Sequence, residues 1–120
     1  MKMKKTNLIK DKTYQFALDV IQLYVKLRDQ KEFVLSKQLL RSGTSIGANV
    51  EEATAAQSGK DFLAKMSIAS KEARETNYWL RLFHDSGLCI GIDFSNLIKE
   101  SAEIIKILTA IVKTSQENLK

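Results

Sequence analysis

The sequence predicts an all-α protein, an antiparallel up-down-up-down four-helix bundle. Three observations support this prediction: the 120 residues include no proline, apolar residues recur every three or four positions, and short polar or glycine-containing segments separate four such stretches. Proline is the strongest helix breaker, so its absence favours long helices. Apolar residues three and four apart share one helical face. Four helices with short connections most simply form an up-down bundle.

The first two helices are expected at residues 12–30 and 33–57. Their inner faces share a helical apolar period: Phe16, Val20, Leu23 and Leu27 in the first, and Leu35, Leu39, Ile46, Val50 and Ala53 in the second. Because this period is unbroken, residues 42–49 are expected to be helical despite Gly43 and Gly47. The two glycines lie four apart and expose backbone along one line, which indicates close approach by a neighbouring helix.

The third and fourth helices are expected at residues 59–86 and 93–117. Ser58 is placed to cap the third, with Asp61 at the capping-box position, and Gly87 to end it in a left-handed conformation. Asp93 is placed to cap the fourth. The chain is therefore expected to form one domain over residues 1–120, with a flexible basic tail at residues 1–11.

The net charge of +5 is concentrated near the N-terminus. The first twelve residues hold five lysines and one aspartate, which leaves the remaining residues close to neutral. Such a tail is more typical of a solubilising leader than of a binding arm. The alternative is contact with nucleic-acid phosphates, for which the sequence offers Lys2, Lys4, Lys5, Lys10, Lys12, Arg28 and Lys31.

The second helix carries a polar stripe at helical spacing, formed by Gln38, Arg41, Ser45, Asn49 and Glu52. In a structural interpretation these groups bond to Glu72, Glu75 or Asn77 of the third helix and fix the packing register. In a functional interpretation they line a lumen or groove and contact a ligand. Both interpretations stay open.

Two helices have more apolar surface than a single bundle requires. These extra stripes define an expected oligomer interface: Tyr14, Leu18, Ile21 and Val25 on the first helix, and Ile68, Tyr78, Trp79 and Leu82 on the third. Two separate patches on one subunit permit head-to-tail contacts that close into a ring. We therefore expect a ring-like homo-oligomer.

Catalytic patterns are lacking. His84 is the only histidine, and the only cysteine, Cys89, is expected to be a small buried hydrophobe. The glutamates of the second and third helices lack the Glu-x-x-His partners of di-metal bundles. We expect no enzymatic activity, cofactor, metal or small-molecule substrate. The single cysteine and the lack of a signal peptide or a long apolar segment predict a cytoplasmic protein without membrane contact.

Residues 38–53 read QLLRSGTSIGANVEEA, and the third helix adds Asp61-Phe62, residues 68–73 (IASKEA) and Glu75. These motifs resemble the four-helix-bundle proteins encoded in intervening sequences of 23S ribosomal RNA genes. The sequence departs from that pattern at Val50 and Glu51, and it lacks the glycine of the third-helix motif.

The resemblance implies a pentameric ring with a link to RNA. The family is also similar in architecture to the accessory proteins of diversity-generating retroelements, pentameric bundles that bind nucleic acid. The function we expect is a non-enzymatic homo-oligomeric binding protein with RNA or DNA as its partner. The alternative is a scaffold that holds a protein partner and has no nucleic-acid role.

Overall fold

The computed structural model describes residues 2–119, with side chains from residue 6 onward. Its helices are α1 (Lys2–Asp29), α2 (Leu35–Thr54), α3 (Gly59–Ser86) and α4 (Ser95–Asn118), and the described residues include no strand. The predicted all-α fold of four helices is confirmed. None of the described helices is both long enough and apolar enough to span a membrane.

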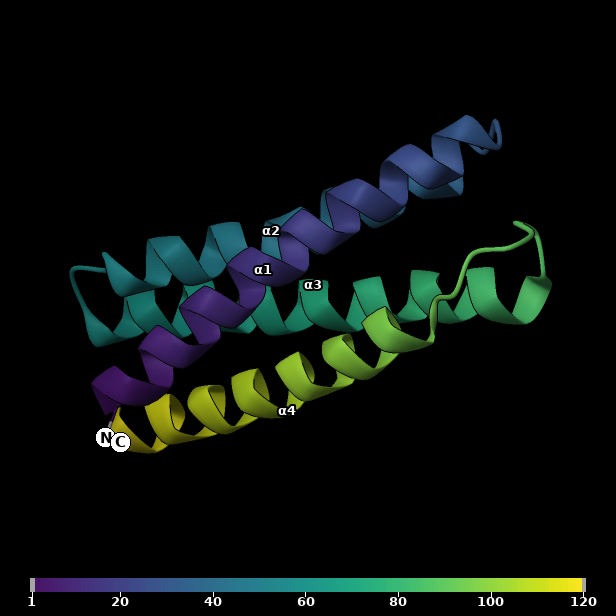
Figure 1. The fold of residues 1–120 in the computed structure, drawn as a ribbon. Helices are drawn as coiled ribbons and strands as arrows, with labels where there is room; N and C mark the ends of the chain where they lie inside the picture. Colours follow the sequence, from purple (N-terminus) through teal and green to yellow (C-terminus); the bar gives the residue numbers. More distant parts are fainter. Residues whose placement is uncertain (1, 120) are drawn as a thin grey trace.

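The four helices pack in sequence order around one core. α1 lies against α2 and α4, and α3 also lies against α2 and α4, so α1 and α3 are diagonal neighbours. In Figure 1 the chain leaves the end where N and C lie along α1, returns along α2, leaves again along α3 and returns along α4. The molecule is a rod of 48 × 21 × 21 Å.

Buried side chains of all four helices form the core, including most of the predicted inner faces of the first two helices. Fully buried side chains come from every helix, among them Val20, Leu27, Leu39, Ile46, Met66, Leu80, Ile104 and Leu108. Phe83 of α3 stacks on Phe94, just before α4, with ring centroids 5.3 Å apart. At the end far from the termini, the Gln30 amide exchanges two hydrogen bonds with the Ile90 backbone, which joins the α1–α2 turn to the α3–α4 connection.

α1 begins at Lys2, so the predicted helix start at residue 12 is wrong, and residues 2–11, which were predicted to form a tail, belong to the helix. The physical reason is that the apolar face of α1 continues toward the N-terminus. Ile9 is fully buried and lies seven and eleven residues before Phe16 and Val20, on the same helical face. The buried Thr13 hydroxyl donates to the Ile9 carbonyl at 2.8 Å.

α2 spans Leu35–Thr54 and is shorter at both ends than the predicted 33–57. At its start, the Glu32 carboxylate accepts hydrogen bonds from the backbone N–H groups of Val34, Leu35 and Ser36, at 3.1, 3.2 and 2.6 Å. This side chain satisfies N–H groups that have no partner within the helix. At the other end, the N–H groups of Ala55 and Ala56 close a turn onto carbonyls of the last helical turn.

α3 has the predicted limits, Gly59–Ser86. The Ser58 hydroxyl accepts from the Asp61 N–H at 3.0 Å, and Gly87 has a φ of 63°. α4 begins at Ser95, two residues later than predicted. The reason is that Asp93 lies outside the helix and holds its first residue. One Asp93 oxygen accepts from the Ser95 hydroxyl and N–H, and these bonds lower the pKa of Asp93.

The predicted close approach at the α2 glycines is confirmed, and the neighbouring helix is α1. A Cβ atom on Gly43 would lie 2.8 Å from Val20 Cγ1, and one on Gly47 would lie 3.3 Å from the Thr13 carbonyl oxygen. Both glycines are buried. The lack of a side chain at these positions therefore sets the distance between α1 and α2.

Candidate interaction surfaces

The polar stripe of α2 faces α3 through its two charged members. Arg41 bonds to Glu72 Oε1 at 2.9 Å through one guanidinium nitrogen and to Glu75 Oε2 through the other. The Trp79 indole N–H donates to the same Glu75 oxygen at 2.9 Å. The hydrogen bond from the indole lowers the pKa of Glu75 most, and the Arg41 guanidinium lowers it further. Glu75 and Glu72 in turn raise the pKa of Arg41.

The other members of the stripe have separate roles. Glu52 pairs with Lys65 of α3 at 2.8 Å, while Asn49 donates to the Ser45 carbonyl and hydroxyl within α2. Gln38 is exposed. Arg41 therefore contacts two of the three partners that the sequence nominated. The third, Asn77, bonds instead to the Ser101 hydroxyl of α4 at 2.9 Å. Two of the five stripe members, Arg41 and Glu52, therefore form contacts between α2 and α3.

We expect Glu75→Gln to destabilise the protein at neutral pH by about 1 kcal/mol, because half of the Arg41 side chain is exposed and solvent screens the pair. The folded-state pKa of Glu75 lies below its ordinary value. The carboxylate therefore stabilises the fold above that ordinary value and loses this effect as the pH falls through the folded pKa. Chemical denaturation at pH 7 and at about pH 3 measures the difference from wild type at each.

The matched control is Glu117→Gln, which removes an exposed carboxylate near the end of α4. It should change the free energy of unfolding by less than about 0.5 kcal/mol at either pH. A Glu75→Gln deficit that is equally large at both pH values would contradict the ionic role of Glu75.

A buried hydroxyl pair between α2 and α3 was missed in the sequence. Thr76 Oγ1 lies 2.9 Å from Ser42 Oγ, and both residues are fully buried. The Thr76 hydroxyl also lies 2.7 Å from the Glu72 carbonyl, so its proton has two acceptors. Ser42 lies four residues after Gln38 in α2, and its small side chain was the only feature of the sequence that indicated this contact. The pair is a structural contact inside the core.

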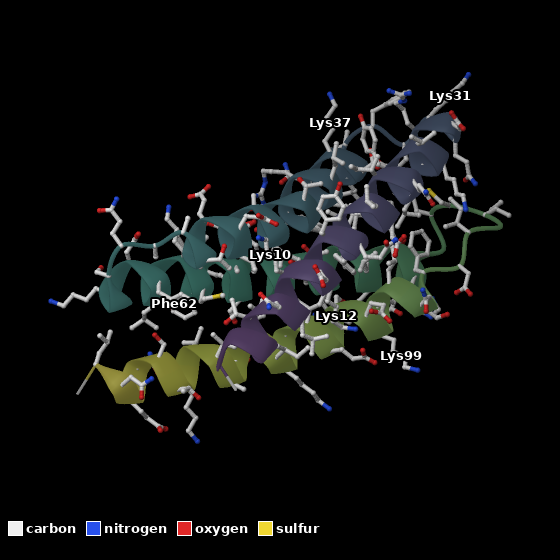
Figure 2. The ribbon with its side chains drawn as sticks, turned by 60° about the vertical axis from the view of Figure 1, so that its left-hand side comes forward. Lys10, Lys12, Lys31, Lys37, Phe62 and Lys99 are labelled. Atoms are coloured by element: carbon white, nitrogen blue, oxygen red, sulfur yellow. The ribbon has the colours of Figure 1, made fainter. Side chains whose placement is uncertain are left out.

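Two of the lysines proposed for nucleic-acid contact are engaged within the bundle. Lys12 of α1 bridges Glu100 and Glu103 of α4 at 3.2 and 3.1 Å, and its pKa is raised, first by Glu103. Lys10 lies 3.5 Å from Glu51 of α2. In Figure 2 these two lysines lie on α1, away from Lys31.

The other proposed contacts have different surroundings. Arg28 is exposed and lies over the Tyr24 ring, 5.7 Å from its centroid. The side chains of Lys2, Lys4 and Lys5 lie outside the described residues. Nucleic-acid contact by this set of seven stays a prediction.

The extra apolar stripes are exposed on the two diagonal helices. Exposed members are Tyr14, Leu18, Ile21 and Val25 on α1, and Ile68, Tyr78 and Leu82 on α3, with Tyr14 the most open at 62%. Trp79 differs, because it is only partly exposed and packs on the core. Polar groups of α2, including Arg41 and Glu52, lie on the helix between the two stripes. The stripes therefore form two separate apolar faces, the α1 face and the α3 face.

Titratable groups with catalytic potential are dispersed. Cys89 is buried, and this burial raises the pKa of its thiol. His84 is exposed near the end of α3. In the part of the chain that the structure describes, no three His, Cys, Asp or Glu side chains form a group that could hold a metal.

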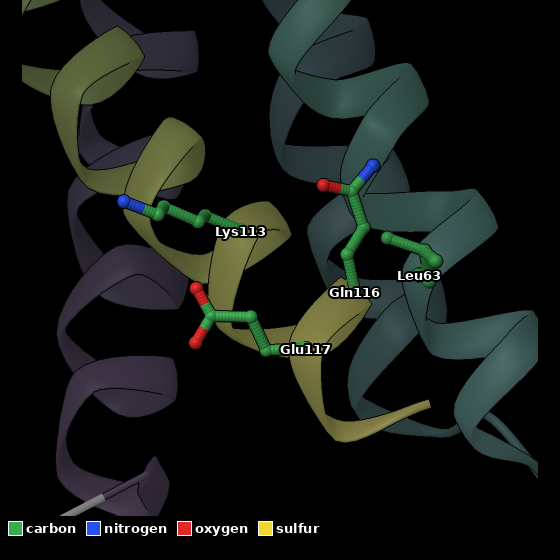
Figure 3. A pocket seen from close by; sticks show the side chains of 4 residues that line it. All are labelled: Leu63, Lys113, Gln116 and Glu117. Atoms are coloured by element: carbon green, nitrogen blue, oxygen red, sulfur yellow. The ribbon is translucent and has the colours of Figure 1, made fainter. Parts of the chain in front are cut away.

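One surface depression lies where α3 begins and α4 ends. It is lined by Leu63, Lys113, Gln116 and Glu117, and the Leu63 side chain extends toward that of Gln116 (Figure 3). A second, along α1 and α4, is lined by residues that include Lys12, Phe16 and Glu100. Neither gathers a nucleophile and a base.

The fold and these surfaces define a small four-helix protein with interhelical ion pairs and exposed apolar faces. The chain belongs to the family of 23S rRNA-intervening sequence proteins, whose model matches residues 5–110. The resemblance seen in residues 38–53 and in the third helix is thus confirmed.

A solved structure with the same fold comes from Bacteroides thetaiotaomicron VPI-5482. It is described as a protein with unknown function from the S23 ribosomal protein family, solved at 1.70 Å resolution. The two chains are 49% identical and superpose with a TM-score of 0.85, over 91% of this chain and 98% of the other. No curated protein matches the chain.

Proposed function

We propose that this chain is a non-enzymatic, cytoplasmic binding protein whose antiparallel bundles assemble into a ring-like homo-oligomer, with nucleic acid as the partner of the assembly. The observation that carries the proposal is the pair of exposed apolar faces on diagonal helices. Contiguous exposed aliphatic and aromatic side chains are typical of interfaces. Because the two faces differ in sequence and position, each fits a different face on a neighbouring copy.

Such a head-to-tail contact repeats around an axis and closes into a ring when the rotation permits. The pentamer that the family resemblance implies is one such ring. Repetition also multiplies charge: five copies of a chain with net charge +5 would carry +25. Weak contacts on each subunit can then combine into strong binding to a polyanion.

The nucleic-acid part of the proposal is supported by the net charge and by the descriptions of the relatives. The family is named for 23S rRNA-intervening sequences, and the solved structure is assigned to a ribosomal protein family. The exposed apolar faces also suit a second candidate function, a scaffold that holds a protein partner and binds no nucleic acid.

Two measurements on the full chain test the proposal. Light scattering coupled to gel filtration should give a single species several times heavier than the 13.6 kDa monomer. Fluorescence anisotropy should show binding of nucleic acid that weakens steeply as salt increases. A monomer at tens of micromolar protein would overturn the assembly. A defined oligomer that binds neither RNA nor DNA would favour the protein scaffold.

A further inference from the structure

One side of the bundle, formed by α3 and α4, carries cations without carboxylate partners. We define the α3–α4 basic face by Arg74, Arg81, Lys99, Lys106 and Lys113. The three lysines are exposed and lie seven residues apart, so they project from the same side of α4 over about 21 Å at 1.5 Å rise per residue. Lys99 is seen in Figure 2 on the outer side of α4, well separated from Lys31 and Lys37.

The two arginines extend this row onto α3. Arg74 donates to the Thr109 hydroxyl at 3.1 Å, and Thr109 lies between Lys106 and Lys113 in α4. Arg81 donates to Asn77 at 2.8 Å, and Asn77 reaches α4 near the Lys99 end through Ser101. Both guanidinium groups therefore lie along the border with α4.

The carboxylates in the central parts of α3 and α4 pair with cations of the other two helices. Between residues 62 and 84 of α3 these are Glu72 and Glu75, and both bond to Arg41 of α2. Between residues 94 and 116 of α4 they are Glu100 and Glu103, and both bond to Lys12 of α1. Acidic groups are thus held at the α2–α3 and α1–α4 borders.

The α3–α4 border is left with positive charge. Across residues 6–119, none of the five cations of the basic face lies within ion-pair distance of a carboxylate. Asp85 and Asp93 lie toward the Lys99 end, and at the other end Glu117, one turn after Lys113, lines the same depression as Lys113. A chain that is almost neutral outside its N-terminus therefore has a strongly cationic side, because its ion pairs are segregated.

We infer that the α3–α4 basic face binds the phosphate backbone of duplex nucleic acid without reading its sequence. This inference rests on the proposed function and assigns the place of contact. Cations fixed on rigid helices suit a rigid, regularly charged partner. The α4 residues exposed between 95 and 114 are small or polar apart from the lysines: Ser95, Asn96, Ala102, Thr109 and Thr114.

This surface chemistry distinguishes among polyanions. A helix that lies on a lipid surface presents large apolar side chains beside its cations, and the exposed residues of α4 between 95 and 114 include none of that kind. Single-stranded nucleic acid is bound largely by bases stacking on aromatic rings. The exposed residues of α4 between 95 and 114 include no aromatic side chain, and on α3 the Arg81 guanidinium lies over the Tyr78 ring at 5.9 Å from its centroid. Duplex phosphates are the chemistry that fits.

The test compares two triple variants of the full chain that remove equal charge. The first is Lys99→Gln, Lys106→Gln and Lys113→Gln on the basic face. The matched control is Lys26→Gln, Lys37→Gln and Lys60→Gln, three exposed lysines that belong neither to the α3–α4 basic face nor to the set of seven predicted contacts. Anisotropy is measured with an RNA duplex and a DNA duplex, each of about 24 base pairs, between about 50 and 200 mM salt. Light scattering verifies that both variants keep the wild-type mass.

The basic-face variant should bind about 10-fold or more weakly, and its log–log salt slope should fall by up to about 2.7 per subunit for three lost phosphate contacts. The control should keep the wild-type slope. A similar effect of both triples would overturn the inference, because total charge would then explain binding. Wild-type affinity in the basic-face variant would show that the α3–α4 basic face is not the binding site, and would leave the nucleic-acid part of the proposed function standing. No binding of either duplex by the wild type would overturn both the face and the nucleic-acid part of the proposed function.

Discussion

Replacing Leu18 and Ile21 by glutamate is expected to convert the assembly into monomers without loss of helix. Both side chains are exposed, at 39% and 43%, so the substitutions should leave the core intact. In the proposed interface, however, they would bury two carboxylates without partners, at a cost of several kcal/mol per charge. Gel filtration with light scattering should report the monomer mass, and circular dichroism should match wild type.

The matched control is Leu88→Glu with Ile90→Glu, which adds the same charge at two apolar residues that are 54% and 83% exposed in the α3–α4 connection. Neither residue belongs to an apolar face, so this variant should keep the wild-type mass. Monomers from both variants would show that added negative charge is sufficient to dissociate the assembly, and would remove the special role of the α1 face.

A mixing experiment tests the head-to-tail geometry. A second variant, Ile68→Glu with Leu82→Glu, disables the α3 face and keeps the α1 face. Each variant alone should be monomeric. Mixed together, they retain one intact pair of faces and should form a dimer that grows no further. If each variant alone stays dimeric, like faces bind one another and the head-to-tail arrangement is wrong.

The sequence predicted best where short-range chemistry decides the structure. Ser58 and Gly87 set the limits of α3 because a side-chain cap and a left-handed glycine act within one turn. The start of α1 was predicted wrongly because lysines surround Ile9. Its seven-residue spacing to Phe16 carried the correct signal, but only tertiary packing shows that Ile9 is buried.

The polar stripe of α2 shows that the partners of a side chain also depend on tertiary packing. Helical spacing placed Arg41 and Glu52 on one face, and chemistry nominated Glu72 and Glu75 as acceptors for Arg41. Spacing alone could not show that Asn77 faces α4. The partners of Arg41 and Glu52 on α3 could therefore be assigned only from the packing of α2 on α3.

The basic face depends even more on packing. The seven-residue repeat of Lys99, Lys106 and Lys113 is readable in the sequence. Whether these lysines form a cationic surface depends on Glu100 and Glu103, which are close to them in the chain but pair with Lys12 on another helix. A charge count along the chain adds these lysines and glutamates together, so the residues after the first twelve come out nearly neutral.

Gly43→Val should destabilise the fold strongly, by about 3 kcal/mol, because it overpacks the contact between α1 and α2. The Cβ atom alone would lie 2.8 and 2.9 Å from the two γ-carbons of Val20. Val20 is β-branched and buried, so its side chain cannot rotate away without a steric penalty. α1 would have to move off α2. Thermal unfolding at fixed protein concentration should show a fall in Tm of about 10 °C.

Alanine substitutions separate this clash from helix propensity. Gly→Ala favours a helix by about 1 kcal/mol at either glycine, but the contacts differ. Gly47→Ala would place its Cβ 3.3 Å from the Thr13 carbonyl oxygen, a tight contact that a small shift can relieve, so its net effect should be near zero. Gly43→Ala should be clearly destabilising. Equal effects at the two positions would contradict the role assigned to Val20.

A double-mutant cycle with Val20→Ala gives the decisive comparison, because it removes the two γ-carbons that a new Cβ on Gly43 would meet. Val20→Ala alone leaves a cavity in the wild-type core and should destabilise it by about 2 kcal/mol. In the Gly43→Ala background the same change also relieves the clash, so its cost should be smaller by about 1 kcal/mol or more. Strict additivity would mean that α1 and α2 adjust freely, and that Gly43 does not set their separation.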